Sequence, residues 1–193
     1  MIKKVCVYCA SSSKVAEEYK RQAYRLGELL ADAGIETKFG SGSVGLMGAL
    51  AEGVLSKKGV IVGVIPQFMV DEGWGNDSVT RQIVTDTMHT RKKTMAEDVD
   101  AAVALPGGCG TMEELLEIIT WKQLGLFNKP IIILNVNHYY DDLLRMMDNV
   151  VSENFMRKEH LSMWSVVTDA QQVLPAIESA PAWRCNARDI AAI

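Results

Sequence analysis

The stretch AAVALPGGCGTMEELLEIIT, residues 101–120, places an apolar run, a glycine-rich turn and an acidic amphipathic segment in immediate succession. A short apolar run that ends at Pro and Gly is typical of a buried strand, and the apolar spacing that follows is typical of a helix. The stretch therefore predicts a strand over Ala101–Leu105, a loop of bare backbone, and a helix over 111–123.

The same pattern of strand, small-residue turn and helix repeats on both sides of this stretch. Further strands are predicted at Val5–Cys9, Thr37–Gly40, Val60–Ile65, Ile83–Thr85, Ile131–Val136 and Val166–Thr168, and further helices at 15–33, 45–57, 89–98 and 141–153. Such alternation predicts an α/β fold that is Rossmann-like and doubly wound, with a mostly parallel sheet of about seven strands flanked by helices. We expect one domain over residues 1–193, with a functional loop at 66–80 and an irregular tail from about residue 180.

Composition and charge limit the class of partner. A net charge of -4 and a pI near 5.4 argue against a broad surface for nucleic acid or anionic membranes. The longest apolar runs, such as PIIILNV at 130–136, are far shorter than the roughly 20 residues of a membrane helix. We interpret MIKKVCVYCA, at the start, as the first strand and not as a signal peptide, because its apolar part is too short. The sequence thus predicts a cytoplasmic protein with a small-molecule ligand, no nucleic acid and no membrane.

The cysteines and histidines do not have the spacing of a metal site. Cys6 and Cys9 lie three apart in a predicted strand, so their side chains should point to opposite faces of the sheet. With Cys109 and Cys185 they are expected to be free, mostly buried thiols. No metal and no resident cofactor are expected.

Three predicted strands end in small-residue loops that lead into helices: CASSS (9–13), FGSGSVGLMG (39–48) and LPGGCGT (105–111). In a parallel sheet these loops meet at the carboxyl edge, where helix N-termini point N–H groups at anions such as phosphate. A G-x-G-x-x-G match begins at Gly40, but PQF stands where a dinucleotide-binding domain needs an acidic residue, and no Walker G-K-[ST] triplet occurs. Each glycine could also serve only a turn.

Charged residues near these loops have two readings. Thr111 and Glu114 have the S/T-x-x-E spacing of a helix capping box, and the Glu114 carboxylate could also face a sugar bound next to the anion. Arg91, Lys92 and Lys93 open a predicted helix, where cations oppose the helix dipole, so either solvent or an anionic or π-rich ligand must compensate them. Taken alone, Arg91 is expected at the surface.

These motifs together resemble those of the Lonely Guy family, phosphoribohydrolases that activate cytokinins and are often mislabelled lysine decarboxylases. The likeness extends from about Val5 to Phe155 and rests on PGGCGTMEE (106–114), which matches the family's PGGxGTxxE, together with SGSVGLMG (41–48), GVIP (63–66), MHTRKKTM (88–95) and TWKQLG (120–125). Ser41 departs from the family's usual glycine. Two effects of this serine are open, a changed loop backbone or an added hydroxyl in the phosphate cradle.

The resemblance implies hydrolysis of the N-glycosidic bond of an adenine-type nucleoside 5′-monophosphate, either AMP or a cytokinin riboside monophosphate, to free base and ribose 5-phosphate. It implies a homodimer, with 121–126 as a possible interface, and Arg91 and Glu114 as the catalytic pair. The substrate-binding residues expected are Ser11, Gly42, Ser43, Gly45, Met88, Pro106, Gly107, Gly108, Gly110 and Thr111. The alternative function is a non-catalytic nucleotide carrier or sensor. Lysine decarboxylation is disfavoured because no lysine stands in a recognisable pyridoxal phosphate motif.

Overall fold

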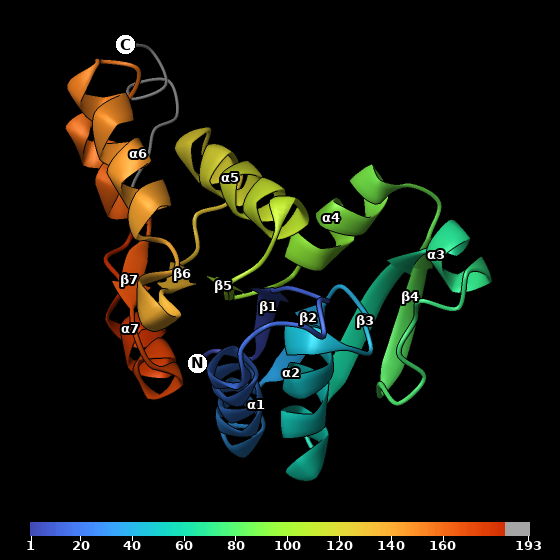
Figure 1. The fold of residues 1–193 in the computed structure, drawn as a ribbon. Helices are drawn as coiled ribbons and strands as arrows, with labels where there is room; N and C mark the ends of the chain where they lie inside the picture. The colour runs from blue at the N-terminus through green and yellow to red at the C-terminus, as the bar shows by residue number, and fades with distance from the viewer. Residues whose placement is uncertain (184–193) are drawn as a thin grey trace.

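A computed structural model describes residues 1–183, which form one parallel sheet between two layers of helices (Figure 1). All strand pairings in the sheet are parallel, and the spatial order is β4-β3-β2-β1-β5-β6-β7. The strands are β1 (Lys4–Tyr8), β2 (Glu36–Phe39), β3 (Ile61–Pro66), β4 (Arg81–Thr85), β5 (Ala101–Ala104), β6 (Ile131–Leu134) and β7 (Ser165–Val167). The order reverses between β1 and β5, which confirms the predicted doubly wound sheet.

The helices cover both faces of the sheet. They are α1 (Glu17–Asp32), α2 (Gly45–Ser56), α3 (Gln67–Asp71), α4 (Met88–Ala96), α5 (Cys109–Gln123), α6 (Asp141–Ser152) and α7 (Val173–Ser179), with short 3₁₀ turns η1 (Val136–His138), η2 (Lys158–Met163) and η3 (Ala170–Gln172). In Figure 1 the helices α1, α2 and α7 lie on one face, and α4, α5 and α6 lie on the other. Within residues 1–183, no helix is both long and apolar enough to cross a bilayer.

Strand β1 divides its side chains between two separate cores. Val5 and Val7 of β1 belong to the core under α1 and α2, whereas Cys6 and Tyr8 belong to the core under α4 and α5. Cys9 lies in the first core, so Cys6 and Cys9 face opposite sides of the sheet as predicted, and both are buried free thiols. Burial on both faces explains why β3, β5 and β6 are continuous apolar runs.

Two short helices were not predicted. The expected loop at 66–80 is wrong for α3, where Pro66, in extended conformation as the N-cap, starts a short helix that ends before Gly73 at φ +72°. The helix α7 contains Pro175, which reads as a helix breaker in the sequence. A proline in the first turn loses no helical hydrogen bond, because the N–H groups there have no partner within the helix. Residues 180–183 have no regular structure, and the rest of the expected tail lies outside the described residues.

Helices α1 and α2 pack with their backbones almost in contact. A Cβ atom on Gly53 would lie 2.1 Å from Tyr24 O, and one on Gly27 would lie 2.4 Å from Leu50 O. Helix propensity favours alanine over glycine by about 1 kcal/mol, but the clash at Gly53 is with backbone that cannot rotate away. Packing should therefore outweigh propensity.

We expect Gly53→Ala to lower the free energy of unfolding by about 1–3 kcal/mol, because the added methyl group forces the two helices apart. Urea denaturation followed by far-UV circular dichroism measures the change. Glu52→Ala, at the exposed neighbouring position on α2, is the matched control and should stay within about 0.5 kcal/mol of the parent. Equal midpoints for the two variants would contradict this account of the packing.

Candidate active site

The three small-residue loops meet at the carboxyl edge of the sheet. The loop after β1 lies between the other two: Ala10 N donates to Pro106 O at 3.3 Å, and Met47 N donates to Ala10 O at 3.1 Å. Strands β1 and β5, which carry two of these loops, are the neighbours between which the strand order reverses. This is the position where doubly wound sheets bind their ligands.

Two helices begin at these loops without a side-chain cap. The N-cap of α2 is Val44 and that of α5 is Gly108, and neither has a side chain that accepts a hydrogen bond from a backbone N–H of its helix. Position 45 requires glycine for two reasons: its φ is +64°, and a Cβ there would lie 2.5 Å from Ser12 O. The first N–H groups of each helix have no acceptor within the helix, and apart from Met47 N, which donates to Ala10 O, they are suited to an anion.

The predicted capping box at Thr111 and Glu114 is wrong. The helix α5 starts at Cys109, two residues earlier than expected, because Gly108 is extended (φ -80°, ψ -160°) and acts as the N-cap. Thr111 is therefore inside the first turn, where it is buried against Gly107. Since Glu114 does not cap the helix, its carboxylate is available to another element.

That other element is α4, which brings Arg91 to Glu114. The Arg91 Nη1 donates to Glu114 Oε1 at 3.2 Å, its Nε donates to Val64 O at 3.1 Å, and its Nη2 donates to Gly40 O at 3.2 Å. Both side chains are buried, with 6% of each residue exposed. The expectation that Arg91 lies at the surface is thus wrong, because one carboxylate and two carbonyls replace the water that a lone guanidinium would need.

A second ion pair runs beside the first. Lys92 is buried and its Nζ lies 2.8 Å from Glu113 Oε1 and 3.1 Å from Glu117 Oε1. Its hydrogen bond with Glu113 raises the pKa of Lys92 and lowers the pKa of Glu113. Adjacent residues of α4 therefore bind adjacent residues of α5, which fixes Arg91 against Glu114. Lys93, the third cation of the run, is exposed and pairs with Glu97 at 3.5 Å.

Burial changes the acidity of Glu114. Removal from water raises its pKa from the ordinary 4.5 to about 7, and the nearby Arg91 guanidinium opposes part of this rise. The carboxyl group can therefore gain or lose its proton near neutral pH. Acids and bases of enzymes are commonly poised in this way.

A cavity of about 300 Å³ opens beside Arg91 at the ends of β2 and β3. Its lining contains four predicted site residues and several apolar residues. Some of the apolar residues belong to α3 and to the segment that follows it. The predicted residues are Ser11, Gly42, Ser43 and Arg91, and the apolar ones are Val44, Met47, Ile65, Met69 and Trp74. Met69 and Trp74 were not predicted individually, although both lie in the 66–80 stretch that the sequence marked as functional.

The other predicted residues do not line this cavity. A cavity of about 150 Å³ is lined by Pro106, Gly107 and Gly108 together with Ala10, Ser12 and Tyr139, so the loop after β1 contributes to both cavities. Gly45 lines a groove of about 540 Å³ between α1 and α2, which also includes Ser43. The remaining predicted residues line none of these three cavities; they are Met88, Gly110, Thr111 and Glu114.

Ser41 has a backbone conformation typical of glycine, and its hydroxyl binds another side chain of the protein. It has φ +62°, the left-handed region that glycine occupies most easily, and it is fully buried. Its Oγ accepts a hydrogen bond from Gln82 Nε2 at 3.0 Å and lies close to Gly63. Of the two effects left open, the added cradle hydroxyl is wrong, because this hydroxyl points into the protein.

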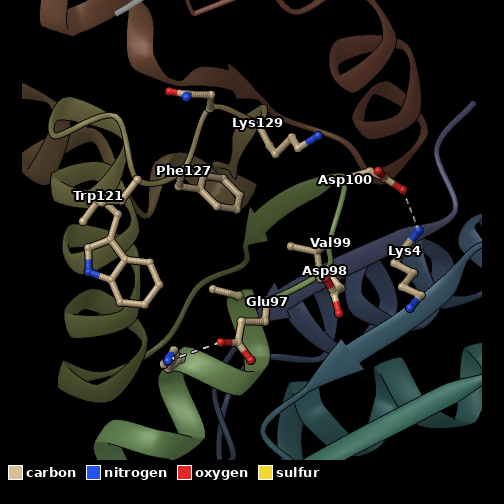
Figure 2. A pocket seen from close by; sticks show the side chains of 12 residues that line it. Lys4, Glu97, Asp98, Val99, Asp100, Trp121, Phe127 and Lys129 are labelled. Atoms are coloured by element: carbon tan, nitrogen blue, oxygen red, sulfur yellow. Dashed lines mark hydrogen bonds and ion pairs between the residues drawn. The ribbon is translucent and has the colours of Figure 1, made fainter. Parts of the chain in front are cut away.

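A larger cavity, of about 830 Å³, lies at the opposite edge of the sheet (Figure 2). Figure 2 shows Trp121 and Phe127 on one side and Lys4 and Asp100, at the amino ends of β1 and β5, on the other. None of the predicted site residues lines it. Parallel sheets bind ligands at the carboxyl edge, so the 300 Å³ cavity beside Arg91 and the 150 Å³ cavity at Gly107 and Gly108 are the better candidate site.

The segment 121–126, predicted as a possible interface, is only partly exposed. Leu124 and Leu126 are 45% and 71% exposed, whereas Trp121 is half-buried. Over residues 1–183, no group of three or more His, Cys, Asp or Glu side chains is arranged to hold a metal ion.

Sequence comparisons find relatives that cover most of the chain. A family model described as "Possible lysine decarboxylase" matches residues 47–177. Cytokinin riboside 5'-monophosphate phosphoribohydrolase LOG2 of Arabidopsis thaliana is 39% identical over 176 residues, which is 91% of this chain and 83% of the relative. The LOG1 enzyme of the same plant is 42% identical over 154 residues, which is 80% of this chain and 72% of the relative.

Structural comparisons find the same fold in more distant proteins. The molybdenum cofactor binding protein of Rippkaea orientalis superposes with a TM-score of 0.71 at 21% identity, covering 93% of this chain and 97% of that one. The molybdenum cofactor carrier protein of Chlamydomonas reinhardtii gives a TM-score of 0.70 at 21% identity, covering 93% and 98%. At this identity the likeness extends to the fold alone.

Proposed function

The chain belongs to the Lonely Guy family, and we propose that it hydrolyses the N-glycosidic bond of an adenine-type nucleoside 5′-monophosphate to free base and ribose 5-phosphate. The plant relatives are named as phosphoribohydrolases of a nucleoside monophosphate, which supports this class of reaction. The observation that carries the proposal is the buried pair of Arg91 and Glu114, 3.2 Å apart, beside two uncapped helix N-termini.

In this mechanism the enzyme binds the substrate mainly through its phosphate. The N–H groups at the starts of α2 and α5 would hold its negative charge, with Gly107, Gly108 and Gly110 allowing close approach. Binding energy from this remote group positions the sugar for cleavage. A nucleoside that lacks the phosphate should therefore react slowly even though its reacting bond is the same.

Cleavage makes the ribose positive and the departing base negative. The ion pair offers an opposite charge to each of them. The ribose becomes positive as the glycosidic bond breaks, and the ionised Glu114 carboxylate stabilises that charge and orients a water or the sugar hydroxyls. Arg91 stabilises the negative charge that accumulates on the departing base. Because both groups are buried, their fields act with little screening by solvent.

The apolar lining of the 300 Å³ cavity supports a further choice of substrate. Met69 and Trp74 lie in the same lining as Arg91, and Trp74 is 56% exposed, so the cavity has an apolar edge towards solvent. Such an edge suits an apolar substituent on N6 of the base. We therefore propose that a prenylated nucleotide reacts at least as well as AMP.

The test compares release of ribose 5-phosphate from AMP, from isopentenyladenosine monophosphate and from the two corresponding nucleosides. We expect turnover of the nucleotides and at least about 100-fold lower kcat/KM for the nucleosides, because they lack the phosphate. Saturable binding of AMP without release of the sugar phosphate would instead favour the carrier or sensor function.

Trp74→Ala should lower kcat/KM for isopentenyladenosine monophosphate by about tenfold and affect AMP less, since an apolar group of that size contributes about 1–3 kcal/mol to discrimination. The matched control is Phe68→Ala, which removes an exposed aromatic side chain of α3 that does not line the cavity. Equal losses for the two substrates would count against an N6 pocket at Trp74.

The decarboxylase description of the family does not fit these residues. Lysine decarboxylation uses pyridoxal phosphate bound to a lysine in the site. Among the described residues, the linings of the 300 Å³ and 150 Å³ cavities include no lysine, and the nearby Lys92 is held by Glu113 and Glu117.

A further inference from the structure

Two consecutive tyrosines donate hydrogen bonds to the glycine loop, residues 105–108, which joins β5 to α5. Tyr140 Oη donates to Leu105 O at 2.6 Å, and Tyr139 Oη donates to Gly107 O at 2.5 Å. The two carbonyls lie on either side of Pro106, so both hydroxyls bind the loop that leads into α5. We propose that Tyr139 and Tyr140 are positioning residues that orient this loop for the phosphate of the substrate, an inference that rests on the function proposed above.

The peptide between Gly107 and Gly108 needs a hydrogen bond to fix its orientation. A peptide joining two glycines can turn over at little cost, because neither residue has a Cβ that restricts its backbone. In a trans peptide the C=O and the following N–H point in opposite directions. With Gly107 O bound to Tyr139, the N–H of Gly108, the N-cap of α5, points away from the tyrosine.

Tyr139 does not need this bond to satisfy its hydroxyl. Tyr139 is 42% exposed, so a water molecule could accept the hydrogen bond from its hydroxyl equally well. Tyr140 is different, since it is 1% exposed and a buried hydroxyl requires a protein partner. The bond from Tyr139 therefore points to a role in the loop, and Tyr139 lines the same 150 Å³ cavity as Gly107 and Gly108.

The segment before the tyrosines makes a tight turn that hydrogen bonds hold in place. Asn137 and His138 have φ of +50° and +60°, the left-handed region that asparagine and histidine enter more readily than most other residues. The Asn135 side chain fixes the end of this turn, because its Oδ1 accepts from Tyr140 N and its Nδ2 donates to Asp141 Oδ1, both at 2.7 Å. The backbone that carries Tyr139 and Tyr140 is therefore held by side-chain contacts of its own.

The test is Tyr139→Phe, which keeps the ring and removes the hydroxyl. We expect KM for the nucleotide to rise about fivefold with kcat changed less than about twofold, as loss of one hydrogen bond implies. The inhibition constants of ribose 5-phosphate and of inorganic phosphate should rise by the same factor, and that of adenine should stay constant. Ser152→Ala, which removes a hydroxyl-to-carbonyl bond on α6, is the matched control and should change none of them.

Two results would overturn the proposal. One is an unchanged affinity for ribose 5-phosphate and phosphate in Tyr139→Phe, and the other is a parallel loss of adenine affinity, which would mean a general disturbance of the site. Calorimetric titration of ribose 5-phosphate tests the proposal even if the parent protein releases no sugar phosphate from nucleotides, a result that would contradict only the proposed function. Tyr140→Phe, compared in the same titration, should weaken ribose 5-phosphate binding in the same direction.

Discussion

Glu114→Gln is expected to lower kcat/KM for the nucleotide by about 10³-fold, because it removes the negative charge that stabilises the ribose in the transition state. Glutamine keeps the size of the side chain and can still accept the hydrogen bond from Arg91 Nη1, so the site should keep its shape. Steady-state release of ribose 5-phosphate measures the loss. A variant that keeps near parental activity would remove Glu114 from the mechanism.

The pH dependence identifies the same carboxylate independently. Burial raises the pKa of Glu114 in the free protein to about 7, and the ionised form is the one that acts, so kcat/KM of the parent should rise as pH increases through about 7. The residual kcat/KM of Glu114→Gln should lack that rise. The phosphate of the nucleotide itself titrates near a pH of about 6 and affects both proteins equally, so the difference between the two pH profiles reports Glu114.

Stability should change in the opposite direction to activity. The folded protein binds the Glu114 proton more tightly than the unfolded chain, so the free energy of unfolding falls as pH rises from about 4.5 to about 7. This contribution amounts to about 3 kcal/mol and should be missing from Glu114→Gln. Glu97→Gln, at an exposed carboxylate beside α4, is the control and should keep the parental dependence.

The fold could be predicted because each strand is decided by local sequence. A strand such as Ile131–Leu134 is buried on both faces, so four apolar residues in a row identify it without knowledge of its neighbours. Errors in the ends of elements have local causes too. The predicted strand to Val136 stops at Leu134, because the Asn135 side chain turns the chain by binding Tyr140 N and Asp141.

The site could be predicted only in part, because its side-chain contacts join distant segments. The glycine loops could be predicted because a run of glycines and other small residues is recognisable in the sequence alone. The burial of Arg91 was missed because its partner Glu114 is 23 positions away and its carbonyl acceptor Gly40 is 51 positions away. The same limit applies to Tyr139, which reaches Gly107 across 32 positions with no sequence motif to mark it.

Arg91→Met should have the second large effect, on activity and on stability together. Loss of the guanidinium leaves the departing base without a cation, and we expect kcat/KM to fall by at least about 100-fold. It also leaves Glu114 buried without its partner, and breaking a buried pair costs about 3–5 kcal/mol. Lys93→Met, at the exposed lysine two positions along α4, is the matched control and should leave both quantities close to those of the parent.

The loss of stability in Arg91→Met should depend on pH in a defined direction. Arg91 holds the pKa of Glu114 below the value that burial alone would give, so without it the carboxyl group stays protonated to higher pH. A protonated carboxyl is far less costly to bury than a carboxylate, and the destabilisation should therefore be small near pH 5 and large at pH 8. Urea denaturation at the two pH values measures the difference.

The double variant Arg91→Met, Glu114→Gln separates electrostatics from packing. If the cost of the single variant comes from an unpaired buried charge, removing that charge should restore most of the stability at pH 8 while activity stays lost. If the cost comes instead from the lost hydrogen bonds of Arg91 to Gly40 O and Val64 O, the double variant should be as unstable as Arg91→Met at both pH values. The second outcome would contradict the view that Arg91 and Glu114 are a compensated charge pair, and with it the division of charge on which the proposed cleavage depends.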